Sequence, residues 1–262
     1  MVILFVILGL APSIIWLGYY LRKDVHPEPN SMVLGVFLWG ILIAPLAAGA
    51  EIMFAYLGKD WGILEFPNVI VWNFIGIAFI EEYAKYYVVK RKVLKNKSFD
   101  EPVDAMIYLV IAALGFAALE NILILLNPLI TNYLSMIFPE IKPVIGFEIS
   151  DAVQLITIRF WGATFLHTLS SAVLGFFLAL SFYHKGRFKY EIFPIGLILA
   201  TLLHGLFNYF ILQIEATAPS SSMIWTYLLL LIVLLGSSAV MVDKLFRILR
   251  SRWALSEIQL PK

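Results

Sequence analysis

The sequence predicts an all-α membrane protein, a polytopic bundle of about seven transmembrane helices with one interfacial segment. Of its 262 residues, 61% are hydrophobic and only 14% are charged, and the mean hydropathy is +0.88. Apolar runs of the length that crosses a bilayer, about 20 residues each, recur along the whole chain. They leave room for short loops but for no separate soluble domain. We therefore expect residues 1–262 to form a single integral membrane domain.

The runs begin at the N-terminus. The first segment lacks the basic leader and the small-residue cleavage site of a secretory signal, so we expect it to remain as a span. Small residues at 47–50 of the second span favour close helix packing, and Pro102 suits the first turn of the fourth. Three prolines interrupt residues 127–154, which we interpret as a segment lying on the membrane surface. The expected spans cover residues 2–21, 32–57, 69–89, 103–126, 155–182, 192–214 and 223–242.

The loop charges predict the orientation. If the chain crosses the membrane seven times, 15 of the 19 Lys and Arg residues fall on one side of the membrane. Such an excess marks the cytoplasmic side. The N-terminus is then outside and the C-terminus cytoplasmic, in the cell membrane. The net charge is +1 without a basic stripe, so no nucleic-acid partner is expected. The absence of cysteine excludes thiol catalysis and thiolate metal sites.

Several ionisable or amide side chains lie inside the expected spans. A charge at the bilayer centre costs about 2.5–3.5 kcal/mol on insertion scales, so these residues need a partner or a function. Counted from the span ends, they fall into one layer in the outer half of the membrane. We expect them to form one buried site. The predicted site residues are Glu81, Glu82, Lys85, Glu120, Asn121, His167, His204 and Asn208.

Helical spacing adds detail to this site. Lys85 follows Glu81 by four residues and Glu82 by three, so it can meet either carboxylate but neutralise only one. Two buried carboxylates in different states are a common source of general acid–base chemistry. His204 and Asn208 are also four residues apart and share one helix face. We interpret Glu51 as a packing residue, and Arg159 as an interfacial anchor or a partner for Glu51 or Glu148.

At these positions the sequence resembles the PrsW family of intramembrane proteases. An early loop with Asp24, Pro27, Glu28 and Pro29 also looks like the family's first loop. The matching motifs lie in order on successive spans: Glu81-Glu82-x-x-Lys85, Phe116-x-x-x-Glu120-Asn121, His167 and His204-Gly205-x-x-Asn208. The resemblance implies cleavage of a membrane-anchored, single-pass protein near its extracytoplasmic side, as with an anti-sigma factor.

PrsW proteins are similar in turn to the CAAX prenyl-endopeptidases and bacteriocin-processing proteins. That wider resemblance implies that Glu81 activates a water and that His204 and Asn208 bind the oxyanion. The wider group has histidine at the position of Glu120, so the missing imidazole is expected to come from His167. The implied mechanism uses neither a metal nor another cofactor.

Two alternatives remain at this point. One is a zinc protease with His167, His204 and either Glu120 or Glu81 as ligands, because these residue types suit zinc. It lacks a His-Glu-x-x-His helix, and a lysine beside the carboxylates opposes a cation. The other is an ion- or proton-coupled transporter, since intramembrane carboxylates and histidines also form relays. Against it, the sequence shows no inverted repeat. Neither the substrate nor the oligomeric state follows from the sequence.

Overall fold

The computed structural model is helical, with no β-strand in the residues it describes: 1–24, 26–63, 65, 68–138, 140–183, 188–218 and 220–258. Lys185, Arg187 and Lys262, which the orientation argument uses, lie outside these residues. The segments in chain order are α1 (Val2–Leu21), α2 (Asn30–Gly58), the 3-10 turn η1 (Lys59–Trp61), α3 (Val69–Val71), the π-helical η2 (Trp72–Phe79), α4 (Ile80–Lys92), α5 (Pro102–Ile137), α6 (Ile149–Trp161), α7 (Ala163–Tyr183), α8 (Phe188–Ala216) and α9 (Met223–Ile258).

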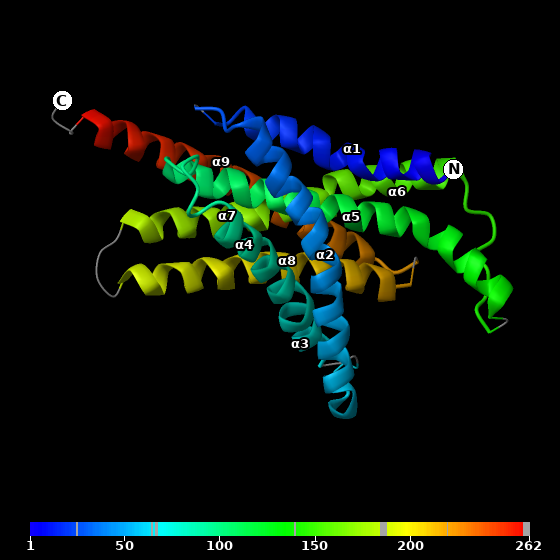
Figure 1. Ribbon diagram of the computed structural model, residues 1–262. Coiled ribbons are helices and arrows are strands. Elements are labelled where there is room, and N and C mark those ends of the chain that lie inside the picture. Colours follow the sequence, from blue (N-terminus) through cyan, green and yellow to red (C-terminus); the bar gives the residue numbers. More distant parts are fainter. Residues whose placement is uncertain are drawn as a thin grey trace.

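Helix α5 forms the centre of the bundle (Figure 1). Every residue from Val103 to Ala118 is buried, as expected for a helix that is apolar on all sides. Helices α1, α2, α4 and α7 pack around it. The first residues of α5 are fixed by a capping box, in which Glu101 and Asp104 each accept a backbone N–H of the other's turn.

Glycines set how closely α2 and α7 approach α5. A Cβ atom at Gly40 of α2 would lie 2.2 Å from the Ala112 carbonyl oxygen, and one at Gly175 of α7 would lie 2.6 Å from the Met106 Cα. Both contacts are to backbone, so no larger side chain fits at either position. This close packing brings α7, which carries His167, against the core helix.

The residues expected to form the third span form one continuous helical rod, built from α3, η2 and α4. Its middle turns are π-helical from Trp72 to Phe79, a wider helix that is frequent at functional sites. The Trp72 ring folds onto Gly76, where a Cβ atom would meet it at 2.3 Å. The ordinary α-helix resumes at Ile80, so the Glu81–Glu82 pair stands in the first turn after the change of helix type.

Within the part of the chain that the structure describes, six helices are long and apolar enough to cross a membrane: Val2–Leu21, Asn30–Trp61, Pro102–Ile137, Ile149–Phe182, Glu191–Ala216 and Met223–Ser251. The rod from α3 to α4 is not among them, because its charged residues lower its hydropathy. A polytopic all-helical protein is thus confirmed, whereas the seven-span count and the orientation of the termini stay predictions. Large apolar side chains exposed on the outer helices, such as Trp225 and Ile232, suit contact with lipid.

Several predicted helix ends were wrong. Helix α5 continues to Ile137 instead of ending at Leu126, because Pro128 removes one N–H donor without stopping the helix. The proposed interfacial segment 127–154 therefore starts as an extension of α5 and ends as the first turns of α6. The fifth span breaks at Gly162, whose backbone angles (φ −100°, ψ −101°) separate α6 from α7. Helix α9 extends to Ile258, well beyond residue 242.

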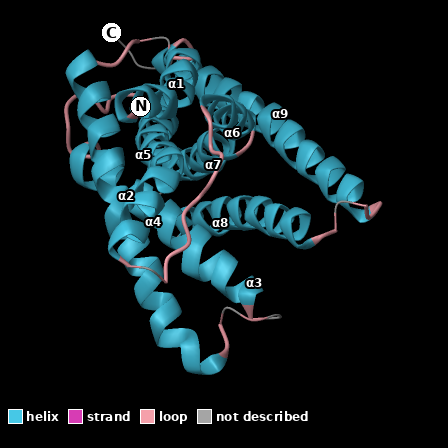
Figure 2. Cartoon of the chain, turned by 90° about the vertical axis from the view of Figure 1, so that its right-hand side faces the viewer, coloured by secondary structure: helices cyan, strands magenta, loops and turns pink. Residues whose placement is uncertain are grey.

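Figure 2 shows α8 lying between α3 and α9. Contacts confirm this order, since α8 packs against η2 on one side and α9 on the other. A Cβ atom at Gly205 of α8 would lie 2.3 Å from the Phe74 ring of η2. The glycine after His204 therefore lets α8 approach the rod that carries Glu81.

Candidate active site

Helix α4 presents three charged side chains in its first two turns, and all three are buried. The Lys85 Nζ donates to a Glu82 oxygen at 2.8 Å and to a Glu81 oxygen at 3.3 Å. These contacts are the i,i+3 and i,i+4 pairs that the spacing predicts. The lysine is thus shared by both carboxylates inside the helix bundle.

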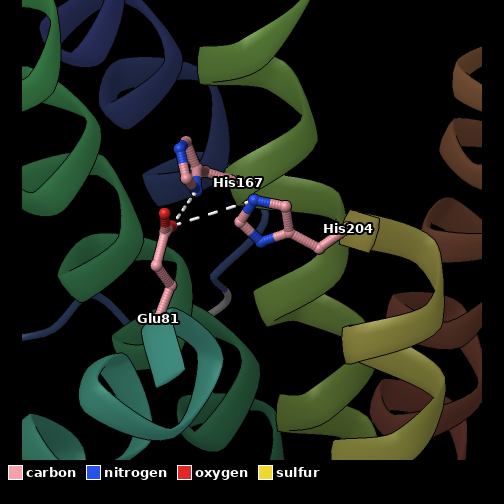
Figure 3. A group of neighbouring side chains, drawn as sticks. All are labelled: Glu81, His167 and His204. Atoms are coloured by element: carbon pink, nitrogen blue, oxygen red, sulfur yellow. Dashed lines mark ion pairs between the residues drawn. The ribbon is translucent and has the colours of Figure 1, made fainter. Parts of the chain in front are cut away.

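Two histidines from neighbouring helices meet this charged turn. Figure 3 shows Glu81 of α4, His167 of α7 and His204 of α8 pointing toward one another. The Glu81 Oε2 lies 3.8 Å from the His167 Nδ1 and 3.8 Å from the His204 Nε2. The imidazole rings stand perpendicular, with centroids 5.0 Å apart. Both histidines are more than 80 positions from Glu81 in the sequence, and a ring nitrogen of each lies near the same Glu81 oxygen.

Each histidine is held from behind by a second carboxylate. The His167 Nε2 lies 2.8 Å from a Glu120 oxygen, and the His204 Nδ1 lies 2.9 Å from a Glu82 oxygen. An ionised carboxylate only accepts hydrogen bonds, so these ring nitrogens carry the protons. The ring nitrogens that face Glu81 are then acceptors. The Lys85 ammonium donates to one of them, the His167 Nδ1, at 2.7 Å.

The two adjacent glutamates differ in how fully their oxygens are used. Glu82 is completely buried and accepts from Lys85, from His204, and from the Ser170 and Ser171 hydroxyls at 2.9 Å each. Glu81 accepts one hydrogen bond from the described residues, the long one from Lys85. Four donors saturate Glu82, whereas Glu81 can still bind water or a substrate group.

Arg159 of α6 joins the site from the opposite side. Its Nη2 donates to Glu120 at 3.3 Å, and its Nε donates to the Asn121 side-chain oxygen at 2.5 Å. The interpretation of Arg159 as an interfacial anchor or a partner for Glu51 or Glu148 was wrong. Arg159 lies three residues before the break at Gly162, and its partners on α5 do not follow from spacing within one helix.

Asn121 acts as a clamp between helices. Besides accepting from Arg159, it donates from Nδ2 to the Thr164 hydroxyl at 3.0 Å and to the Gly9 carbonyl at 3.4 Å. Its side chain is fully buried. Its hydrogen bonds therefore link α5 to α1, α6 and α7, and one of them positions Arg159.

A cavity of about 1090 Å³ opens beside these groups and lies between η2 and helices α2, α6, α7, α8 and α9. Asn208, half-buried one turn beyond His204, lies on its wall and forms no side-chain hydrogen bond with the described residues of the cluster. Glu82 and Lys85 are not part of the lining. The site residues that border the cavity are Glu81, Glu120, His167, His204 and Asn208.

Sequence reasoning missed four polar residues of the site. Ser170 and Ser171 lie one turn beyond His167, at a spacing that places them near the same helix face. Arg159 was noticed but given another partner. Asn73 of η2 donates from Nδ2 to the Gly205 carbonyl at 3.1 Å, joining the π-helical stretch to the turn that carries His204. The helix spacing could have indicated the serines, but the other two contacts depend on tertiary packing.

Comparison with known proteins agrees with this arrangement. Residues 28–237, which include the whole cluster, match a family described as PrsW family intramembrane metalloprotease. The chain belongs to the PrsW family. Protease PrsW of Geobacillus kaustophilus is 31% identical over 79% of each chain, and that of Bacillus subtilis is 27% identical over 85% of each. Protease PrsW of Clostridioides difficile is 24% identical over 91% of this chain and 89% of its own.

No solved structure gives a significant match. The PrsW relatives indicate that the chain is a peptidase, and its six apolar helices are those of a multi-pass protein of the cell membrane. The family description also implies a metal ion. The atoms around Glu81 show whether such an ion would fit there.

Proposed function

We propose that this chain is an intramembrane endopeptidase that hydrolyses a peptide bond of a single-pass, membrane-anchored protein, with a water activated by Glu81. One observation carries the proposal: Glu81 borders the cavity, and its Oε2 lies 3.8 Å from a ring nitrogen of each of two histidines. A water donating to the Glu81 carboxylate and to the His204 Nε2 would satisfy both acceptors. Glu81 also keeps unused acceptor capacity, which a general base requires.

The reaction then follows from the positions of these groups. As the water oxygen attacks the scissile carbonyl carbon, Glu81 takes one of its protons. The C–N bond breaks when the leaving nitrogen receives a proton from Glu81, which restores the carboxylate. Lys85 lies next to Glu81 and stabilises its ionised form before the attack.

The developing oxyanion needs donors on the cavity side of Glu81. Asn208 supplies an amide on the cavity wall, one turn from His204. The single ring proton of His204 is on Nδ1, where Glu82 binds it, so in the proposed reaction His204 orients the water through Nε2 and Asn208 supplies the donor to the oxyanion. His167, fixed between Lys85 and Glu120, supplies the imidazole that position 120 lacks relative to the wider group.

The proposed substrate is a membrane-anchored regulatory protein of the anti-sigma-factor type, cut near its extracytoplasmic side. This rests on the family resemblance and on the outer-half depth inferred from the sequence. The size of the cavity supports a peptide substrate, because about 1090 Å³ is far more than the ~30 Å³ that one water occupies. The three relatives named above are all proteases, and no observation favours the transporter alternative.

A metal-dependent version of the reaction is the second candidate, and one observation favours it. The ligand atoms of Glu81, His167 and His204 lie within 4.8 Å of one another. Both histidines have a carboxylate on the other ring nitrogen, an arrangement typical behind zinc-bound histidines. These three residues would hold a divalent ion such as zinc, which would supply polarisation of the attacking water.

Lys85 distinguishes the two candidates. Its ammonium donates to the His167 Nδ1, the nitrogen that an ion would need, and lies 3.3 Å from Glu81. Two unit charges about 4 Å apart repel by about 4 kcal/mol at an effective dielectric constant of 20, and a divalent ion doubles that cost. The donor types fit a metal, but the lysine favours the metal-free reaction, which we take as the main proposal.

The experiment that tests the proposed function is cleavage of single-pass reporter peptides by the purified protein in liposomes. Wild type should release a defined product, and Glu81→Gln should not. If neither protein cuts any reporter of a broad panel, the proposed peptidase activity is wrong.

A further inference from the structure

Glu51 occupies an unusual position in the cavity. It lies in α2, seven residues before the helix ends at Gly58, and its half-buried side chain borders the cavity. The wall carries three other glutamates: Glu81 pairs with Lys85, Glu120 pairs with Arg159 and His167, and Glu215 is exposed near the end of α8. Among the described residues, none forms a hydrogen bond or ion pair with Glu51. The interpretation of Glu51 as a bonded packing residue is therefore wrong.

An unpaired carboxylate at this depth is costly. Desolvating an ion costs several kcal/mol unless a counter-charge or hydrogen bonds compensate it. No cation of the described cavity wall is available for Glu51, because the Arg159 guanidinium is already bound to Glu120 and Asn121. A group that enters the cavity can supply the missing positive charge.

The position of Glu51 indicates which kind of chemical group can supply this positive charge. At 1.5 Å per residue, its Cα lies about 10 Å along the axis from the last residue of α2. It is thus about two turns inside the end of α2, and it shares the cavity with Glu81. A substrate segment lying across Glu81 brings its neighbouring side chains past this wall. Lysine and arginine suit the position, because their apolar stems can lie along a membrane cavity while the charged head reaches a carboxylate.

We propose that Glu51 is a specificity-determining residue that binds a lysine or arginine side chain of the substrate close to the scissile bond. This inference rests on the proposed peptidase function and adds the substrate's charge to it. Its carboxylate takes no part in the bond-breaking steps. It acts by ion pairing with the bound substrate, so its effect depends on the sequence of the substrate.

The test uses reporters that are identical except at one residue near the cleaved bond, which is Lys, Gln or Glu and is moved through four positions on either side. At one position, wild type should cleave the Lys reporter with a kcat/KM at least about tenfold above that of the Gln reporter, equivalent to about 1.4 kcal/mol. Glu51→Gln should lose this preference and cleave the Gln reporter like wild type. Glu51→Lys should prefer the Glu reporter.

Asp60→Asn is the matched control, since Asp60 is an exposed acid beyond the end of α2 and outside the cavity lining. It should keep the wild-type preference. Normal cleavage of the Gln reporter shows that each Glu51 variant is folded. Equal cleavage of all reporters by wild type, or an unchanged lysine preference in Glu51→Gln, overturns the inference and leaves the peptidase function intact. No cleavage of any reporter overturns both.

Discussion

The Glu81 Oε2 and the His204 Nε2 face each other at 3.8 Å, and neither atom has a proton to give the other. The His204 proton is on Nδ1, where the Glu82 carboxylate binds it at 2.9 Å. Glu82 thereby sets the tautomer of His204, and this tautomer turns a lone pair toward Glu81. Two opposed acceptors beside a cavity form a binding place for a donor, and water is the donor that hydrolysis requires.

The first prediction concerns Glu81→Gln. This change keeps the shape of the side chain but removes the base, so cleavage should fall at least about 100-fold. Glu65→Gln is the matched control, because Glu65 is exposed outside the cluster, and it should cleave at the wild-type rate. The measurement is kcat for a liposome-embedded reporter, with monodisperse purification as the check on folding. Retained activity in Glu81→Gln would assign the base to Glu82 or Glu120.

The second prediction tests how much the hydroxyl donors to Glu82 contribute to the stability of the fold. Ser171 donates to the buried Glu82 at 2.9 Å, so Ser171→Ala should lower stability by about 1.5–3 kcal/mol, the usual value of a hydrogen bond to a charged group. Ser237→Ala is the control, because that exposed hydroxyl on α9 bonds to its own helix backbone. Thermal unfolding in detergent measures both. Equal losses in the two variants would show that Glu82 does not depend on its hydroxyl donors.

The contacts around Glu81 were easier to predict from the sequence than the ends of the helices that carry them. Contacts within one helix follow from spacing, and Lys85 meets Glu81 and Glu82 as predicted. The meeting of Glu81, His167 and His204 followed from the cost of placing polar groups in a membrane, together with the family motifs. Both arguments hold whatever the details of the packing are.

What could not be predicted depends on tertiary geometry. The contact of Arg159 with Glu120 joins α6 to α5 close to the break at Gly162, and neither the contact nor the backbone angles of that glycine follow from the sequence. The π-helical turns at 72–79 occur where the Trp72 ring packs on Gly76, and residue propensities do not indicate a π-helix there. Helix α5 continues past Pro128 although proline ordinarily marks an end. In each case the neighbouring helix decides the outcome.

The third prediction is a pH dependence outside the membrane spans. Glu28, between α1 and α2, is buried and accepts a hydrogen bond from Tyr108 at 2.5 Å. Burial raises the pKa of Glu28 from 4.5 to about 8, and the Tyr108 hydrogen bond offsets part of this. Between these values the folded state binds more protons than the unfolded state, so stability falls as pH rises through that window.

Glu28→Gln removes this titration. The melting temperature of wild type should therefore fall between about pH 5 and about pH 8 by more than that of the variant. Melting curves in detergent at several pH values provide the measurement. Parallel curves for the two proteins would show that Glu28 does not titrate between these limits in the folded state.

The fourth prediction concerns metal. Because Lys85 donates to the nitrogen that an ion would need, purified active protein should contain no stoichiometric zinc, and strong chelators should leave turnover unchanged. Elemental analysis and chelator titration measure this. If zinc is present at one per chain and is lost together with activity, the metal-dependent candidate replaces the main proposal. In that case His167→Ala and His204→Ala should each abolish zinc binding.

The last prediction concerns Asn208 and separates catalysis from substrate binding. Asn208 borders the cavity one turn beyond His204 and lies outside the bonded cluster around Glu82, so its loss should leave that cluster intact. If it donates to the oxyanion, its effect appears in the transition state and little in the ground state. Asn208→Ala should then lower kcat by about 10²–10³-fold, the range for one such donor, while KM changes only slightly.

Asn208→Asp serves as the matched variant, because it keeps the size but replaces the donating amide with an acceptor, and it should be at least as inactive. The double change His204→Ala/Asn208→Ala should cost less than the product of the two single effects, since residues that act together on one reaction step are not additive. Should Asn208→Ala instead raise KM with kcat unchanged, this wall of the cavity binds substrate and the oxyanion donor must lie elsewhere. The amide of Asn73, which is held by Gly205 next to His204, is then the first group to substitute.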